Sequence, residues 1–198
     1  MTKQMIKEKL LETKLMMAHQ RRKEIRKHLD YYSGVSTEQY IDHYFNGDAF
    51  SEIPPTLTNF TRKFINKISR IYSLGAKRTA GNNSERYNEL IPTKDVRMKH
   101  SERMTRLLGT VANRVYWMDG VFDYRPIYYF ETYFGDNPFE PNAIVYPLLN
   151  STSDLSNTEA LQWEYWDAEK YGVMDEDGNM MSESANPYGI IPFVFTHR

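Results

Sequence analysis

The spacing of apolar residues changes near the middle of the chain. Over the first 120 residues, apolar positions recur every three or four residues, which is typical of amphipathic helices. Beyond residue 120, aromatic and branched residues alternate with polar ones at a period of two, which is typical of strands. We expect helices over residues 5–28, 58–74 and 93–118. We expect strands over residues 121–134, 143–149, 161–166, 171–174 and 179–181.

The helix over residues 58–74 has the clearest amphipathic pattern. Thr56 or Thr58 can cap its N-terminus, and Gly75 follows the last apolar position, where a helix commonly ends. The polar residues 75–92 predict a loop. The apolar positions of this helix are Leu57, Phe60, Phe64, Ile68, Ile71 and Tyr72.

Turn signals divide the second half of the chain into consecutive strands. Pro126 favours an edge strand or a break between two strands, and Asp177-Gly178 is typical of a hairpin turn. Helices followed by an antiparallel β meander predict an α+β fold. We divide the chain into an N-terminal helix with an aromatic, acidic segment, a helical part and a sheet part, at residues 1–50, 51–120 and 121–198.

Composition excludes several classes of protein. The 198 residues include no cysteine, so neither disulfides nor cysteine zinc sites can form. No apolar run reaches the length of a membrane-spanning helix, so we expect no membrane association. The charge is unevenly divided, since residues 60–106 carry a net +8 and residues 107–198 a net −10. Oppositely charged halves can pair with each other, between copies, or with different partners.

The residues that could carry catalysis form no recognisable constellation, and we therefore predict a protein that is not an enzyme. Asp175, Asp177 and Asn179 match three positions of a calcium loop, but Met180 and Asn186 stand where glycine and glutamate are required. We assign no catalytic residue, no metal ligand and no cofactor. The histidines are scattered along the sequence, at His19, His28, His43, His100 and His197.

Two patterns in the sequence could be binding surfaces. The first could instead be a solvated helix face, and the second could instead be part of the buried core. The basic faces of residues 58–74 and 94–106 have the charge that phosphate contact requires. The aromatic run over residues 124–134, with Trp163 and Trp166, could stack on sugars or bases if the rings are exposed, or form the core of the sheet if they are not. Neither pattern assigns a nucleic-acid contact to an individual residue.

The last segment of the sequence combines a turn with a strand-like apolar run. Asn186-Pro187 favours a turn, and Gly189 permits a positive φ. We expect the run that follows to pack back onto the earlier helices. Because the sequence stops three residues after this run, we also expect the chain to be a portion of a larger fold. The residues expected to pack are Ile190, Ile191, Phe193 and Phe195.

Three stretches, in this order, resemble the portal proteins of tailed bacteriophages. The first is the Pro54-Pro55 segment with the helix that follows it, up to Tyr72. The second runs from Val115-Tyr116-Trp117 to Pro147-Leu148. The third runs from Trp163-Glu164-Tyr165-Trp166 through the Asp177-Gly178 turn and the Asn-Pro-Tyr-Gly-Ile-Ile-Pro pattern at residues 186–192 to Val194.

The resemblance implies a virion structural protein in the ring at one capsid vertex, through which double-stranded DNA is packaged and ejected. Family members form rings usually of twelve copies, and their partners are the terminase, the capsid, head–tail adaptor proteins and the DNA in the channel. The resemblance places the protein in the virion, and in the host cytoplasm during assembly. This chain would be the N-terminal wing portion of such a subunit. The alternative is a small aromatic-rich binding module for nucleic acid or carbohydrate.

Overall fold

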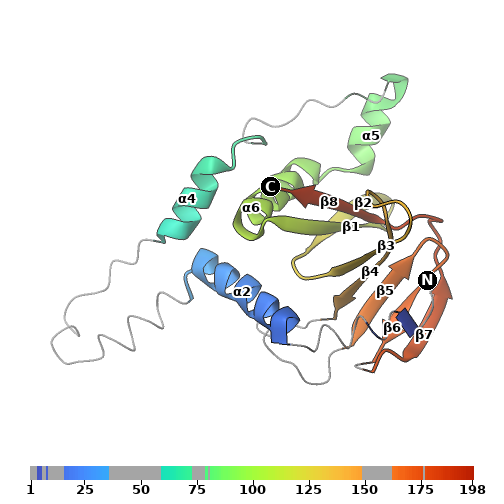
Figure 1. Cartoon of the computed structure of the whole chain (residues 1–198). Helices are drawn as coiled ribbons and strands as arrows, with labels where there is room; N and C mark the ends of the chain where they lie inside the picture. The colour runs from blue at the N-terminus through green and yellow to red at the C-terminus, as the bar shows by residue number, and fades with distance from the viewer. Residues whose placement is uncertain are drawn as a thin grey trace.

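A computed structural model of the chain shows helices packed against two antiparallel β-sheets (Figure 1). Helices precede strands along the sequence, so the α+β class predicted from the sequence is confirmed. Among the described residues there is no helix with the length and apolar character that a membrane crossing requires. The structure describes residues 4–5, 8, 16–35, 59–72, 79, 81–148, 162–175 and 177–198, and only the backbone of residues 16–19.

The strands form one sheet of three and one sheet of five. The three-stranded sheet has the order β2-β1-β8, and the five-stranded sheet is a meander with the order β3-β4-β5-β6-β7. The predicted strands are all present in the described residues, with shifted ends. The bounds are β1 Thr110–Met118, β2 Val121–Ile127, β3 Glu131–Phe134, β4 Pro141–Pro147, β5 Trp163–Asp167, β6 Lys170–Met174, β7 Met180–Ala185 and β8 Phe193–His197.

Pro126 lies in β2, which is an edge strand, and the chain leaves this sheet directly after β2. Both features agree with the sequence prediction, because proline cannot donate to a second neighbouring strand. The Asp177-Gly178 turn is also confirmed. Gly178 has φ 79°, and the backbone N–H of Asp175 donates to the carbonyl of Asn179 at 3.0 Å.

The prediction of a helix over residues 93–118 is wrong beyond residue 108. Helix α6, Lys94–Leu108, ends at Gly109, whose φ of 90° and ψ of −48° suit glycine alone. The next residues, rich in β-branched and aromatic side chains, form β1 in place of two more helical turns. Val111 is therefore buried in a sheet and not on a helix face.

Helix α4, Phe60–Ile68, is shorter than predicted. Its N-cap is Asn59, whose side-chain oxygen accepts the N–H of Arg62 at 2.7 Å. The helix does not continue to Gly75, because the N–H groups of Ile71 and Tyr72 donate to the carboxylate of Glu102. The predicted caps Thr56 and Thr58 and the predicted stop Gly75 lie outside the described residues.

Two further helical segments differ from the prediction. Helix α2, Met16–Ser33, covers the second half of the helix predicted over residues 5–28 and continues to Ser33. Part of the loop predicted over residues 75–92 is helical, namely the 3-10 turn η2, Gly81–Asn83, and helix α5, Ser84–Leu90. A run of seven residues without glycine or proline permits α5, although its composition is polar.

The five-stranded sheet buries aromatic side chains on both faces. One face packs on Ile25 of α2, and the buried guanidinium of Arg22 lies over the rings of Tyr129 and Trp163 at 5.7 and 5.9 Å. The other face packs on the three-stranded sheet through Ile144, Tyr146, Trp166, Ala112 and Phe193.

The terminal segment does not pack on the helices as predicted. Phe193 and Phe195 enter the core between the two sheets, where Phe193 lies 5.7 Å from the ring of Tyr146 and Phe195 lies 5.5 Å from that of Phe130. Ile191 borders the same cluster, whereas Ile190 is exposed. The reason is the register of β8 on β1, which points Thr196 and not the phenylalanines at α6.

Replacing Phe193 with alanine tests this arrangement. We expect the free energy of unfolding to fall by about 3–5 kcal/mol, because a buried ring is removed from the core between the sheets. Ile190→Ala, three residues earlier on an exposed side chain, should change it by less than about 0.5 kcal/mol. Urea denaturation followed by circular dichroism measures both. Equal losses in the two variants would contradict the position given to β8.

Candidate functional site

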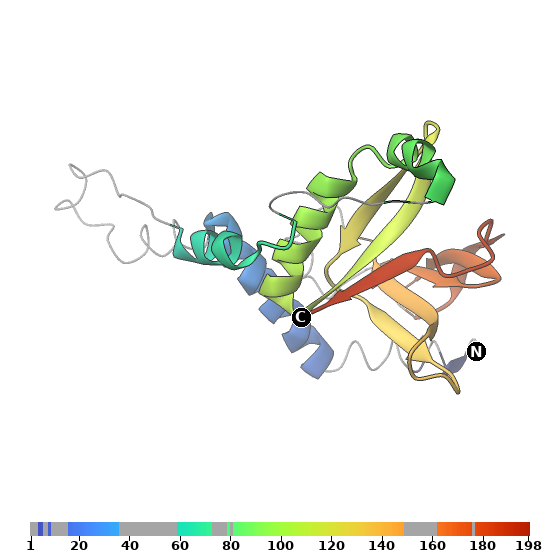
Figure 2. The ribbon, with the colours of Figure 1, turned by 90° about the horizontal axis from the view of Figure 1, so that it is seen from above.

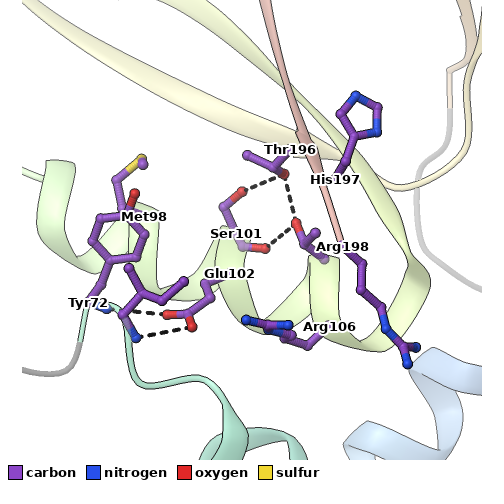
Figure 3. A pocket seen from close by; sticks show the side chains of 10 residues that line it. Tyr72, Met98, Ser101, Glu102, Arg106, Thr196, His197 and Arg198 are labelled. Carbon is purple, nitrogen blue, oxygen red and sulfur yellow. Dashed lines mark hydrogen bonds between the residues drawn. The ribbon is translucent and has the colours of Figure 1, made fainter.

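A cleft of about 290 Å³ lies where the end of the α4 segment, helix α6 and strand β8 meet (Figure 3). Its apolar lining comes from Ile71, Tyr72 and Met98, and polar side chains line the rest. The polar lining residues are Ser101, Glu102, Thr105, Arg106, Thr196, His197 and Arg198. The sequence pattern did not single out this cleft, because its walls come from segments up to 127 positions apart, between Ile71 and Arg198.

Glu102 is the one carboxylate in the cleft lining. Its side chain is buried, and its two oxygens accept the N–H groups of Ile71 at 3.2 Å and Tyr72 at 3.3 Å. Figure 3 shows both bonds reaching from α6 to the segment after α4. Since both oxygens accept from backbone groups, Glu102 holds the α4 segment on α6 and is not placed as a free base.

The hydroxyl groups of the cleft bond to one another. The hydroxyl of Thr196 lies 2.7 Å from that of Thr105 and 3.3 Å from that of Ser101, and Asn113 donates to Ser101 at 2.9 Å. This network joins α6 to β1 and β8 at a place where an apolar core would otherwise be expected. The hydroxyls are therefore parts of a packing junction, and none of them lies beside an unengaged base among the residues that the structure describes.

The rim of the cleft is basic. Arg106 and Arg198 form no ion pair with any carboxylate in the described part of the chain, and the ring of His197 points away from both (Figure 3). Chemically, the rim can attract an anionic group, while the interior offers hydroxyls already bonded to protein. The basic rim and the bonded hydroxyl groups of the cleft suit contact with another molecule better than they suit catalysis.

A second polar cluster joins α6 to the β1–β2 hairpin. The carboxylate of Asp123 accepts hydrogen bonds from the guanidinium of Arg97 at 2.7 and 3.0 Å, from the hydroxyl of Thr93 at 3.0 Å and from that of Tyr116 at 3.1 Å. Burial alone would raise the pKa of Asp123, but these bonds, with one from the N–H of Tyr124, lower that pKa to about 2. Asp123 therefore stays charged and fixes the hairpin to the helix.

The three histidines whose side chains the structure describes lie on three different elements and do not form a cluster. His100 bonds to the hydroxyl of Tyr128 at 3.0 Å, and its burial lowers its pKa. His197 lies at the end of β8 and His28 on α2, while the side chains of His19 and His43 are outside the described residues. No group of three or more His, Asp or Glu side chains suited to a metal ion occurs in the part of the chain that the structure describes.

The segment that matched part of a calcium loop forms a turn held by its own bonds. One oxygen of the Asp175 carboxylate accepts the N–H groups of Asp177 and Asn179 at 2.9 and 2.8 Å, and the other accepts the side-chain amide of Asn179 at 3.0 Å. These bonds stabilise the connection between β6 and β7.

Most rings of the aromatic run belong to the core. Tyr129, Phe130, Tyr133, Trp163 and Trp166 are buried, so these rings are not available for stacking on a ligand. Trp166 stacks on Tyr171 with centroids 4.4 Å apart and lies 4.7 Å below the guanidinium of Arg114. Arg114 also pairs with Glu164 at 2.8 Å, so the rings serve to join the two sheets.

Most of the large apolar side chains of helix α4 and of the residues just after it are exposed. Phe60, Phe64 and Ile71 are 77%, 63% and 67% exposed, and Ile68 is also exposed. The face that α4 turns toward its neighbours is smaller and more polar, with Ile65 and Ser69 buried. Among the sequence-predicted basic faces, that of α4 lies beside this apolar stripe, because Lys63 and Lys67 follow Phe60 and Phe64 by three residues.

A wider groove lies near the start of β6 and the segment that leads into β8. It has a volume of about 800 Å³, and its apolar lining includes Phe139 and Ile190, which are 89% and 66% exposed. Glu140 and Glu169 also line it, and neither bonds its carboxylate to a described residue. The groove therefore combines exposed apolar side chains with a polar lining in which acidic residues outnumber basic ones.

Sequence reasoning missed Glu102, Asp123 and Arg114, whose roles depend on partners from distant segments. A signal existed for Glu102, since the positions spaced by three or four residues around it, Met98 and Thr105, face the same side of α6. A weaker signal existed for Asp123, which is a charged residue within a strand otherwise rich in aromatic residues.

Exchanging Glu102 for glutamine tests its role as a clamp. We expect the free energy of unfolding to fall by about 1–3 kcal/mol, because the amide can accept only one of the two N–H groups and leaves the other unsatisfied. Glu89→Gln, on an exposed position of α5, is the matched control and should stay within about 0.5 kcal/mol of the parent. Thermal unfolding of both variants provides the measurement.

The acid stability of the protein should depend on Asp123. Because its pKa is lowered from 3.8 to about 2, its stabilising contribution is complete above pH 4 and is lost as the pH falls toward 2. Asp123→Asn should remove this part of the acid transition and lower stability at pH 7. Asp136→Asn, at an exposed carboxylate, should leave the transition in place. An unchanged acid profile in Asp123→Asn would refute the assignment.

Comparison with known proteins does not supply a function. No protein-family model matches the sequence, and no curated protein is significantly similar to it. The resemblance to portal proteins therefore depends on the three stretches of sequence alone, and a function has to be inferred from the surfaces of the chain itself.

Proposed function

We propose that the protein is a structural subunit of a viral assembly and contributes a wing-like portion of the portal ring of a tailed bacteriophage. The ring stands at one capsid vertex, where double-stranded DNA is packaged and ejected. The protein works by association with other chains and not by catalysis. Its partners are further copies in the ring, the terminase, the capsid and head–tail adaptor proteins.

The exposed apolar face of α4 carries this proposal. Phe60, Phe64 and Ile71 are each more than three-fifths exposed although they are large and apolar, and Phe60 and Phe64 lie one turn apart on α4. Apolar residues gathered in this way mark surfaces that are covered in an assembly, because leaving them in water costs free energy. A subunit of a ring has such surfaces before it meets its neighbours.

The three stretches that resemble portal proteins follow one another along the chain, with η2, α5 and α6 between the first and the second. The first contains α4, the second runs from the end of β1 through β4, and the third runs from β5 to the start of β8. In the structure, the helix of the first stretch is followed by antiparallel strands in the second and third stretches. This order agrees with the wing-like arrangement that the resemblance implies. This agreement supports the proposal without assigning a role to any one residue.

The position of the protein in virus particles tests the proposal. Antibodies raised against the chain and coupled to gold should label one vertex per particle, at the junction of head and tail, when applied to opened particles made by the encoding genome. Pre-immune serum is the control. Labelling over the whole capsid, labelling along the tail, or particles that lack the protein would each overturn the proposal.

A further inference from the structure

Two surfaces of this chain are complementary to each other and cannot meet within one molecule. The first, here called the α4 stripe, consists of Phe60, Phe64, Ile68 and Ile71 with Lys63 and Lys67 beside them. The second, here called the acidic groove, is lined by Phe139, Glu140, Glu169 and Ile190. In both views of the ribbon, α4 lies at one end of the molecule and strands β6 and β7 lie at the other (Figures 1 and 2).

We propose that the α4 stripe of one copy docks in the acidic groove of a second copy. The proposal deepens the structural role given above and rests on it for its biological meaning, but its physical argument uses the two surfaces alone. The occupant of the groove is thus a second copy of this chain.

The apolar parts of the two surfaces could cover each other. Phe60 and Phe64 lie one helical turn apart on the same side of α4, and each leaves well over half of its surface in water. The groove of about 800 Å³ is large enough to receive both rings, and its own exposed apolar groups, Phe139 and Ile190, would be covered by them. Docking removes all four exposed side chains from water at once.

The charges of the two surfaces are opposite and unengaged. Lys63 and Lys67 form no ion pair with a described carboxylate, and Glu140 and Glu169 form none with a described base. The one lysine in the groove, Lys170, is already paired with Glu183 at 3.1 Å. Apolar surfaces bordered by opposite charges select one orientation of docking and reject the like-charged alternatives.

The geometry makes the contact head to tail. Because each copy uses a different surface toward each of its two neighbours, association does not end at a dimer. It continues into a ring where the rotation between copies closes, and into an open chain where it does not. The ionic border also predicts that association weakens as salt concentration rises.

Charge exchange tests the docking with the whole chain. Lys63→Glu/Lys67→Glu makes the stripe acidic, and Glu140→Lys/Glu169→Lys makes the groove basic. We expect each double variant alone to associate at least about tenfold more weakly than the parent, because like charges then face each other. Mixed in equal amounts, the two variants should associate again, since each has a surface that fits the other. Sedimentation velocity over a concentration series at low salt measures this.

The control is Lys23→Glu/Lys27→Glu, which makes the same change at the same spacing on exposed positions of α2. It should associate as the parent does. A parent that stays monomeric at its highest soluble concentration, equal weakening by the control, or no recovery on mixing would overturn the docking. Salt-sensitive binding of a monomeric parent to a DNA duplex, lost in Lys63→Glu/Lys67→Glu, would overturn it in favour of a nucleic-acid surface.

The docking and the proposed portal role can fail separately. Gold labelling at one vertex together with unaltered association of the charge variants would leave the portal role and reject this interface. Recovery on mixing together with absence of the protein from virus particles would leave the interface and reject the portal role.

Discussion

The position of β1 at the centre of its sheet is the constraint on which the rest of the structure depends. This strand pairs with β2 over residues 112–118 and with β8 over residues 110–114, so it connects the middle of the sequence to its last segment. Its start is fixed by Gly109, because a backbone with φ 90° stops α6 and reverses the chain at once. Without that reversal, α6 could not lie on the sheet that follows it, and neither the cleft nor the Thr196 network would form.

Aromatic residues of the two sheets pack in the core. This packing decides which apolar surfaces remain exposed. The inner faces of the two sheets meet through Phe193, Tyr146 and Trp166, and Arg114 adds a charged bond between them. Trp163 and Trp166 are buried, whereas Trp117 on β1 and Phe134 on β3 are 48% and 52% exposed. Large apolar side chains in water occur on several elements, and those of α4 and of the border of the acidic groove are among the most exposed.

Two carboxylates hold the helices in place. Asp123 secures the β1–β2 hairpin to α6, and Glu102 secures the end of the α4 segment to the same helix. Each accepts hydrogen bonds from another segment of the chain, Glu102 from Ile71, 31 positions away, and Asp123 from Arg97, 26 positions away. A buried carboxylate with its acceptors filled fixes geometry, because any displacement leaves its charge without compensation. The orientation of the exposed α4 stripe is therefore set partly by a polar contact on its opposite side.

The sequence by itself determined the α+β class, the approximate positions of strands β2 to β7, the edge position of Pro126 and the turn at Asp177-Gly178. These features depend on local backbone preference and on the period of the apolar residues, both of which act over a few positions. Only the tertiary structure decided that residues 110–118 form a strand, that Phe193 faces the second sheet, and that the best amphipathic helix leaves its apolar stripe in solvent. The physical reason is that periodicity identifies an apolar face but not what covers it, since burial depends on contacts between segments far apart in the sequence.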